Sequence, residues 1–205
     1  MASCMIHLYT GWRYAQKHAS FLEEPAFYLG CVAPDCVNLD GFADKATRWH
    51  AHLRAADLDQ WEENVSAFYH SAQGTVDLPL LAGYAVHILT DILWDRHFHQ
   101  EIWFQAANLG PNGSGGYDPG WTECFRFDRA LMQSSWWHEA VCPLLALARP
   151  KAINGLPASL LERYRQYVLW EYESSLPLEK PRIIILEQIE KLGEYLLSSG
   201  QKNLS

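Results

Sequence analysis

The sequence lacks several features that would assign it to other classes of protein. No apolar run approaches the ~20 residues that a membrane-spanning helix needs, and the first ten residues lack the charged and apolar regions of a signal peptide. The five cysteines form no CxxC pair, a pattern expected of free thiols in a reducing compartment. We therefore predict a cytoplasmic protein without a transmembrane segment.

Basic residues are also in the minority. Lys and Arg number 16 against 24 Asp and Glu, which gives a formal net charge of −8. Such a composition offers no excess of positive charge to a nucleic-acid duplex, so we expect no duplex DNA or RNA partner. Bound metal ions could still supply the positive charge that a phosphate ester requires.

The chain is long enough and apolar enough to form a hydrophobic core without disulfides. It has 205 residues, of which 49% are hydrophobic and 13% aromatic. Apolar residues recur at helical spacing and no convincing strand or internal repeat is found, so we predict an all-α protein with a single domain, 1–205. A loop rich in Gly, Asn and Pro is predicted at 108–120. Helices are expected at 3–20, 24–32, 43–55, 57–72, 77–97, 122–149, 157–174 and 181–199.

The most apolar of these ranges, 77–97, contains a histidine and an aspartate four residues apart. His87 and Asp91 therefore lie on one face of one helix. Imidazole and carboxylate are both good zinc ligands, although a buried hydrogen bond between the two side chains would satisfy the same spacing. Burial of Asp91 among apolar residues is costly without a partner, which favours the metal site.

Other polar residues could contribute to the same site. His7 lies on the first predicted helix, and Asp35 lies in a turn fixed by the preceding proline. His50 and His52 are two residues apart, so on a helix they point to different faces and only one should reach a shared site.

A more distant histidine follows on the same predicted helix. His97 is ten residues beyond His87, which corresponds to about 15 Å along a straight helix. One ion cannot bridge that distance. His97 therefore binds a different ion, or the helix ends or bends before it, and His99 is a rival for the same role.

Four segments containing these residues resemble the zinc-dependent phospholipase C family, which is distantly related to the single-strand-specific fungal zinc nucleases. The segments are IHLYTGWRYAQ, FYLGCVAPDCVN, RWHAHLR and GYAVHILTDILWDRHF. The resemblance covers about residues 5–98, and the combination of LGxxAPD with GYxxHxxxD is its most specific part. It implies a helical bundle of the phospholipase C and zinc nuclease type, with up to three zinc ions in a cleft and activity on phosphodiester bonds.

The resemblance also implies roles for the matching residues. Asp35 would be a ligand and the general base, Asp91 would bridge two ions, and His97 would begin a third site. The implied metal ligands are His7, Asp35, His50 or His52, His87, Asp91 and His97.

The third zinc ion has the weakest counterpart in this sequence. The family completes that site with an HxxxE pair, whereas here His138 is followed four residues later by Cys142. Secreted members also use an N-terminal amino group as a ligand, and no cleaved signal peptide is expected here. We expect two zinc ions, with a third depending on His97, His99 or His138.

The sequence thus predicts a hydrolase of phosphoester bonds that activates water with a di- or trinuclear zinc cluster. Its substrate would be a small phosphoester or a phospholipid-like molecule. An HD-type phosphohydrolase is excluded because the chain contains no His-Asp dipeptide. The remaining alternative is a helical metal-binding protein, inactive or weakly active, with a structural or interaction role; metal content and activity separate these two hypotheses.

Overall fold

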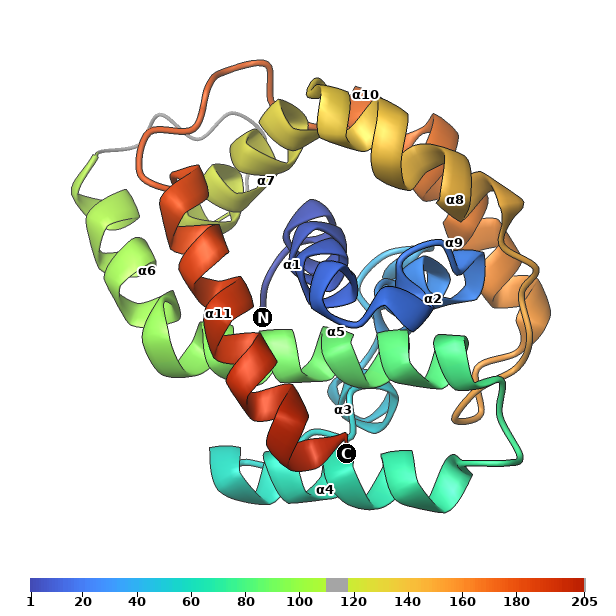
Figure 1. Cartoon of the computed structure of the whole chain (residues 1–205). Helices are drawn as coiled ribbons and strands as arrows, with labels where there is room; N and C mark the ends of the chain where they lie inside the picture. Colours follow the sequence, from blue (N-terminus) through green and yellow to red (C-terminus); the bar gives the residue numbers. More distant parts are fainter. Residues whose placement is uncertain (110–117, 205) are drawn as a thin grey trace.

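The computed structural model describes residues 1–109 and 118–204, and these form helices joined by short connections (Figure 1). The described residues contain no β-strand, so the all-α prediction is confirmed. Residues 110–117, most of the predicted loop at 108–120, lie outside the described residues. Within the described ranges, no helix is long and apolar enough to cross a membrane.

The helices have the following bounds in chain order. They are α1 (Cys4–Lys17), η1 (Ala19–Phe21), α2 (Pro25–Gly30), η2 (Ala33–Asn38), α3 (Lys45–Ala51), α4 (Leu58–Ala72), α5 (Leu78–His97), α6 (His99–Asn108), α7 (Pro119–Met132), the π-helix η3 (Trp136–Val141), α8 (Cys142–Leu147), α9 (Ala158–Trp170), α10 (Tyr172–Ser175) and α11 (Leu186–Asn203).

Helix α5 forms the centre of the core. Asp77 caps its N-terminus by accepting a hydrogen bond from the Leu80 backbone N–H, and every side chain from Leu80 to Trp94 is buried. The helix packs against α1, α2, α4 and α11. Figure 1 shows α1 near the middle of the molecule, with α11 running beside it and crossing α5.

Two glycines bring the backbones of α2 and α5 into contact. A Cβ atom on Gly83 would lie 2.0 Å from the Phe27 carbonyl oxygen, and one on Gly30 would lie 2.3 Å from the Leu80 carbonyl oxygen. Only glycine permits such an approach. The close contact places the end of α2, and the Cys31 carbonyl that follows it, directly against the face of α5 that carries His87.

A buried carboxylate from α7 fixes the start of α1. Asp128 accepts hydrogen bonds from the Ser3 hydroxyl at 2.6 Å and from the Tyr172 hydroxyl. Burial raises the pKa of Asp128 to about 6. A carboxylate at a helix N-terminus interacts favourably with the helix dipole, so Asp128 holds α1, and with it His7, against α7 and α10.

Several of the predicted helices differ from those in the structure. The range 122–149 is not one helix: α7 ends at Met132, and a turn in which the Ser134 hydroxyl donates to the Leu131 carbonyl precedes the π-helix. Helix α6 was not expected. Helix α11 begins at Leu186 rather than near 181, because the backbone N–H groups of residues 182–184 donate to the buried Glu123 carboxylate instead of starting a helix.

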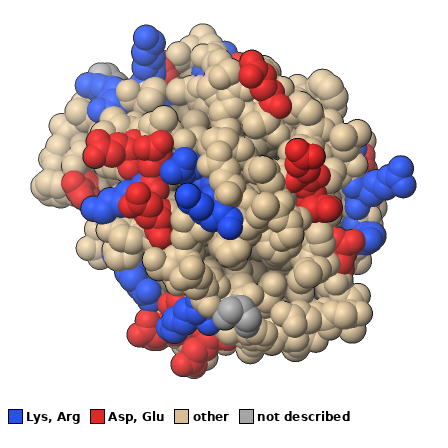
Figure 2. Space-filling model, in the orientation of Figure 1, with Lys and Arg blue, Asp and Glu red and all other residues tan. Residues whose placement is uncertain are grey.

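Charged side chains are interspersed on the face drawn in Figure 2. Basic and acidic groups alternate over short distances there, and no continuous basic surface is visible. This mixture of signs agrees with the composition of the chain, in which acidic residues outnumber basic ones.

Candidate metal centre

Five of the residues singled out in the sequence converge beside the middle of α5. They are His7 of α1, Asp35 of η2, His52 at the end of α3, and His87 and Asp91 of α5. Asp91 lies at their centre. Its Oδ1 is 3.4 Å from His7 Nε2, while its Oδ2 is 3.7 Å from His52 Nε2 and 3.8 Å from His87 Nε2. The two oxygens of one carboxylate therefore face different histidines.

Backbone carbonyls orient two of the imidazole rings. His87 Nδ1 lies 2.8 Å from the Cys31 carbonyl oxygen, and His52 Nδ1 lies 2.9 Å from the Arg48 carbonyl oxygen. A carbonyl can only accept, so each Nδ1 carries a proton, and in the neutral ring each Nε2 presents a lone pair. These two Nε2 atoms are only 3.4 Å apart. Two lone pairs facing each other at that distance require a cation or a shared proton between them.

The chain leaves its helical path directly after His52. Leu53 has a left-handed backbone, with φ of 52°, a conformation that costs an L-residue about 1 kcal/mol. The Trp61 indole N–H donates to the His52 carbonyl at 2.7 Å and holds this turn. The turn ends α3 and allows the His52 side chain to face the core, where it is buried.

His7 and Asp91 are left with unsatisfied polar atoms. The ring of His7 stacks on that of His87, with centroids 3.6 Å apart. Both nitrogens of His7 and the Oδ2 atom of Asp91 are buried and have no hydrogen-bond partner among the described residues. Leaving such atoms unpaired costs about 1–3 kcal/mol each. A metal ion bound to them would remove this cost.

The spacing of the donor atoms fits a zinc ion. Three donors lie around one position, since His52 Nε2 is 3.4 Å from His87 Nε2 and 3.7 Å from Asp91 Oδ2, and the latter two are 3.8 Å apart. Asp35 Oδ1 approaches the same His52 nitrogen at 3.3 Å. A tetrahedral zinc ion with bonds of about 2.0–2.2 Å separates its ligand atoms by roughly 3.3–3.6 Å. Imidazole and carboxylate donors are also the types that zinc prefers.

The electrostatics of the cluster favour a cation as well. Burial and the neighbouring His7 lower the pKa of His87 to about 3, so its ring is neutral near pH 7. Burial opposes the ionisation of Asp91, but His7 outweighs it and lowers the pKa of this carboxyl. For Asp35, the contact with His52 likewise outweighs burial and lowers the pKa. The same contact outweighs burial of the ring and raises the pKa of His52, so that without a metal ion a proton at Nε2 is shared with the carboxylate. The cluster thus combines two carboxylates with the neutral imidazole of His87, and a bound metal ion would displace the proton from His52.

The remaining predicted ligands do not reach the cluster. His50 is exposed on α3, on a different face from His52. His97 is exposed at the end of α5, where its ring packs against Tyr195 with centroids 4.4 Å apart. Helix α5 continues without interruption to His97, so ten residues of helix separate it from His87. His138 is exposed on the π-helix.

A pocket of about 140 Å³ opens beside Asp35. The Asp35 side chain is 15% exposed, whereas that of Asp91 is fully buried. Asp35 therefore belongs both to the cluster and to the pocket wall. Six aromatic side chains line the pocket, which we call the aromatic pocket: Phe42, Trp121, Phe125, Tyr164, Tyr167 and Tyr172. Sequence reasoning did not find them, because aromatic residues at helical spacing are usually core residues.

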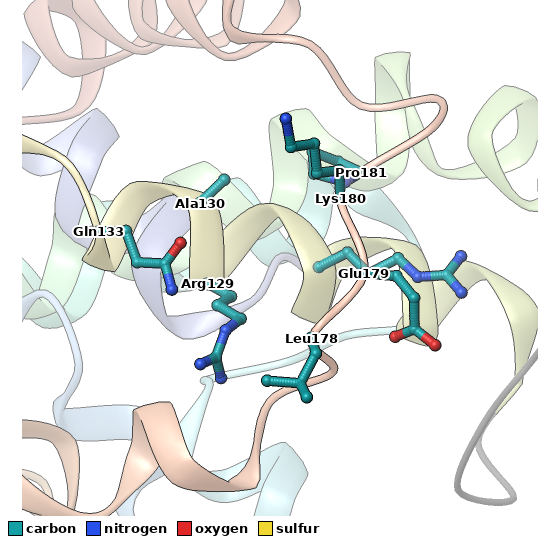
Figure 3. A pocket seen from close by; sticks show the side chains of 8 residues that line it. Arg129, Ala130, Gln133, Leu178, Glu179, Lys180 and Pro181 are labelled. Atoms are coloured by element: carbon teal, nitrogen blue, oxygen red, sulfur yellow. The ribbon is translucent and has the colours of Figure 1, made fainter.

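A larger pocket of about 360 Å³ lies elsewhere on α7. Figure 3 shows Arg129, Ala130 and Gln133 along the helix, with Leu178 and Lys180 on the segment that passes beside it. None of the cluster residues lines this pocket. Of these two pockets, only the smaller aromatic pocket reaches the cluster, through Asp35.

Comparison with known proteins agrees with this geometry. Residues 7–170 match the family model described as zinc-dependent phospholipase C. No curated protein and no solved structure matches the chain. The matched segment contains all five cluster residues and most of the aromatic pocket, and it spans well over half of the sequence. The chain therefore belongs to the zinc-dependent phospholipase C family.

Proposed function

We propose that this protein is a zinc-dependent hydrolase of phosphoester bonds. The observation that carries the proposal is the pair of donor groups around His87: one consists of His7, His87 and Asp91, the other of Asp35, His52 and His87. Both groups are packed into the same buried cluster, and the cluster opens to a pocket through Asp35. A phosphodiester is the expected bond type for this family.

The hydrogen bonds of the cluster support a division into two metal positions. His87 offers only Nε2, because its Nδ1 donates to the Cys31 carbonyl, so it serves one ion. We assign it to one position with Asp35, His52 and Asp91 Oδ2. His7 and Asp91 Oδ1 remain for the second position. Asp91 thereby becomes the bridging ligand, and neither His50 nor His97 receives a role.

Zinc ions at these positions would lower the pKa of a bound water and neutralise charge on the phosphate oxygens. The protein would supply a proton acceptor and a pocket through which the substrate approaches the ions. Asp35 is suited to accept the proton, because its lowered pKa keeps it ionised at neutral pH and its side chain reaches the pocket. His52 holds the Asp35 carboxylate in place through the contact at 3.3 Å.

The substrate of this family is lipid-like, and a small phosphoester or a phospholipid-like molecule fits the proposal. We also propose that residues 1–205 form one domain, since α11 packs on α1, α4 and α5. The cytoplasmic location remains a prediction from the sequence.

Hydrolysis of bis(p-nitrophenyl) phosphate by the purified protein tests the proposal. We expect zinc-dependent release of p-nitrophenol, a loss of at least about 100-fold after dialysis against a strong zinc chelator, and recovery on adding zinc. The melting temperature should rise with zinc, because a ligand that binds only the folded state stabilises it, by about 4 kcal/mol at 1,000 times its Kd. The His97→Ala variant is the matched control and should behave as the parent protein.

A protein that is purified without metal, and that neither binds zinc nor gains stability from it, would contradict the proposal. Zinc binding without hydrolysis of any phosphoester would instead support the non-catalytic alternative. The two results are separated by measuring metal content and activity on the same sample.

A further inference from the structure

We propose that Tyr84 and Asn154 are positioning residues, which hold the side chain of His52 in its place in the cluster. Both lie outside the cluster itself, and Asn154 is 104 residues beyond His50 in the chain. The inference rests on the proposed function, because it takes His52 to be a zinc ligand. It concerns the groups that place this ligand, and therefore the affinity of one metal position.

Side chains donate to four consecutive backbone carbonyls at the end of α3. The last carbonyls of a helix lack partners within the helix, so they must be satisfied from outside. The donors come from α4, from α5 and from the segment between α8 and α9. The pairs are Asn154 Nδ2 to the His50 carbonyl at 3.1 Å, the Tyr84 hydroxyl to the Ala51 carbonyl, the Trp61 indole N–H to the His52 carbonyl at 2.7 Å, and Asn64 Nδ2 to the Leu53 carbonyl at 3.1 Å. A shift of His52 would break several of these bonds at once.

Tyr84 links this turn to the helix that carries the other ligands. It is fully buried on α5, three residues before His87, so the two residues are neighbours on one side of the helix. Its hydroxyl donates to the carbonyl of Ala51, the residue before His52. The Nε2 atoms of His52 and His87 are 3.4 Å apart. The Tyr84 bond therefore joins the two backbone segments whose separation sets this distance.

Residues 153–156 form a tight turn that presents the amide of Asn154. Ile153 and Leu156 pair through two backbone hydrogen bonds, at 3.1 and 2.8 Å, and both side chains are buried. Asn154 and Gly155 have left-handed backbones, with φ of 47° and 74°, as a type I′ turn requires. Asn154 Nδ2 donates to the Tyr84 hydroxyl oxygen at 2.9 Å. Because that oxygen accepts from the amide, its own proton is left for the carbonyl at the end of α3.

The placement of His52 matters because zinc tolerates little variation in its ligand distances, about 0.2 Å. Loss of a group that orients a ligand lowers metal affinity by about 10–100-fold in other metal sites. Of the two proposed metal positions, one includes His52, and the other is formed by His7 and Asp91 Oδ1. Loss of either positioning contact should therefore weaken the first position and spare the second.

Zinc titration of the metal-free protein against a chromogenic chelator tests the inference without measuring catalysis. We expect two dissociation constants in the parent protein. Tyr84→Phe and Asn154→Gly should each weaken one of them about tenfold or more and leave the other within about threefold. Glycine keeps the left-handed backbone of the turn, so Asn154→Gly removes only the amide. The visible absorption of Co²⁺ bound in place of zinc should also change in both variants, because it reports ligand geometry, which a loss of stability alone would not alter.

Lys151→Ala and Tyr28→Phe are the matched controls. Lys151 lies in the same segment as Asn154 but pairs with Asp77 at the start of α5. The Tyr28 hydroxyl donates to the Leu22 carbonyl at 2.8 Å, so Tyr28→Phe loses the same kind of hydrogen bond at a carbonyl that precedes α2. Both controls should keep the zinc dissociation constants and the Co²⁺ spectrum of the parent protein, even where the melting temperature falls.

Unchanged zinc constants in folded Tyr84→Phe and Asn154→Gly variants would overturn the inference and leave their hydrogen bonds with a structural role only. Equal weakening of both constants would overturn it as well, in favour of a general loosening of the core. The proposed function can fail separately: a protein that hydrolyses no phosphoester, but whose variants lose one zinc position selectively, would retain the positioning role without the enzyme. A parent protein that binds no zinc would contradict both.

Discussion

Replacing Asp91 by Asn is expected to remove most of the bound metal and to lower phosphodiesterase activity by about 10³-fold or more, equivalent to about 4 kcal/mol of activation free energy. Asp91 contributes an oxygen to both proposed metal positions, since its Oδ1 faces His7 and its Oδ2 faces His52 and His87. An amide has nearly the same shape but lacks the negative charge that both ions require. Metal content by elemental analysis and the rate of p-nitrophenol release measure the effect.

The Asp95→Asn variant provides the control for this change. Asp95 lies one turn further along α5 and pairs with Arg54 and with the Met1 amino group instead of the cluster. Its replacement should leave metal content unchanged. Asp91→Asn should still fold, because its side-chain oxygen can accept the hydrogen bond that the Ala2 backbone N–H now donates at 2.7 Å. A folded Asp91→Asn variant that retains full metal content would show that Asp91 is a structural partner only.

The second large effect is expected from two histidines that are only two residues apart. His52→Ala should lose the ion held with Asp35 and His87, and activity should fall by about 100-fold or more. His50→Ala should stay within about twofold of the parent protein, because the His50 side chain is exposed on the other face of α3. The two variants remove the same chemical group from the same helix. A difference in their metal content or activity is therefore due to the position of the histidine.

Metal content, activity and circular dichroism of both variants decide this prediction. His52 is buried, so its replacement also leaves space in the core and lowers stability. For that reason the far-ultraviolet spectrum must match that of the parent protein before the metal content is interpreted. A larger loss of metal in His50→Ala than in His52→Ala would reverse the assignment.

The central helix and its site pair could be predicted from the sequence. The largely apolar range 77–97 predicted a buried helix, and the spacing of His87 and Asp91 placed both on one face, as the structure has them. The order of the motifs added Asp35 and His7 through the family resemblance. These features depend on local periodicity or on short motifs, and both are properties of neighbouring residues.

The choice between His50 and His52 could not be made from periodicity. It depends on where α3 ends, and that is set by the left-handed backbone of Leu53 and by the hydrogen bond from Trp61. The carbonyl groups that orient the imidazole rings could not be predicted either. Every residue has a backbone carbonyl, so the sequence does not indicate which one reaches a ring. The Cys31 carbonyl reaches His87 only because two glycines let α2 and α5 touch.

The aromatic pocket was missed for a related reason. Trp121 and Phe125 on α7 show the spacing of an ordinary core stripe, as do Tyr164 and Tyr167 on α9. Whether such a stripe packs against another helix or lines a pocket depends on the separation of the helices. That separation arises from tertiary packing across more than one hundred residues of chain and leaves no local pattern.

The central claim is that zinc binds between α1, η2, α3 and α5, and anomalous diffraction at the zinc absorption edge from crystals of the zinc-loaded protein tests it most directly. The account predicts a peak about 2.0–2.2 Å from donor atoms of Asp35, His52, His87 and Asp91, and a second peak bound by His7 and the other oxygen of Asp91. Anomalous peaks at His97, His99 or His138 with none at Asp91, or no ordered zinc at all, would contradict it.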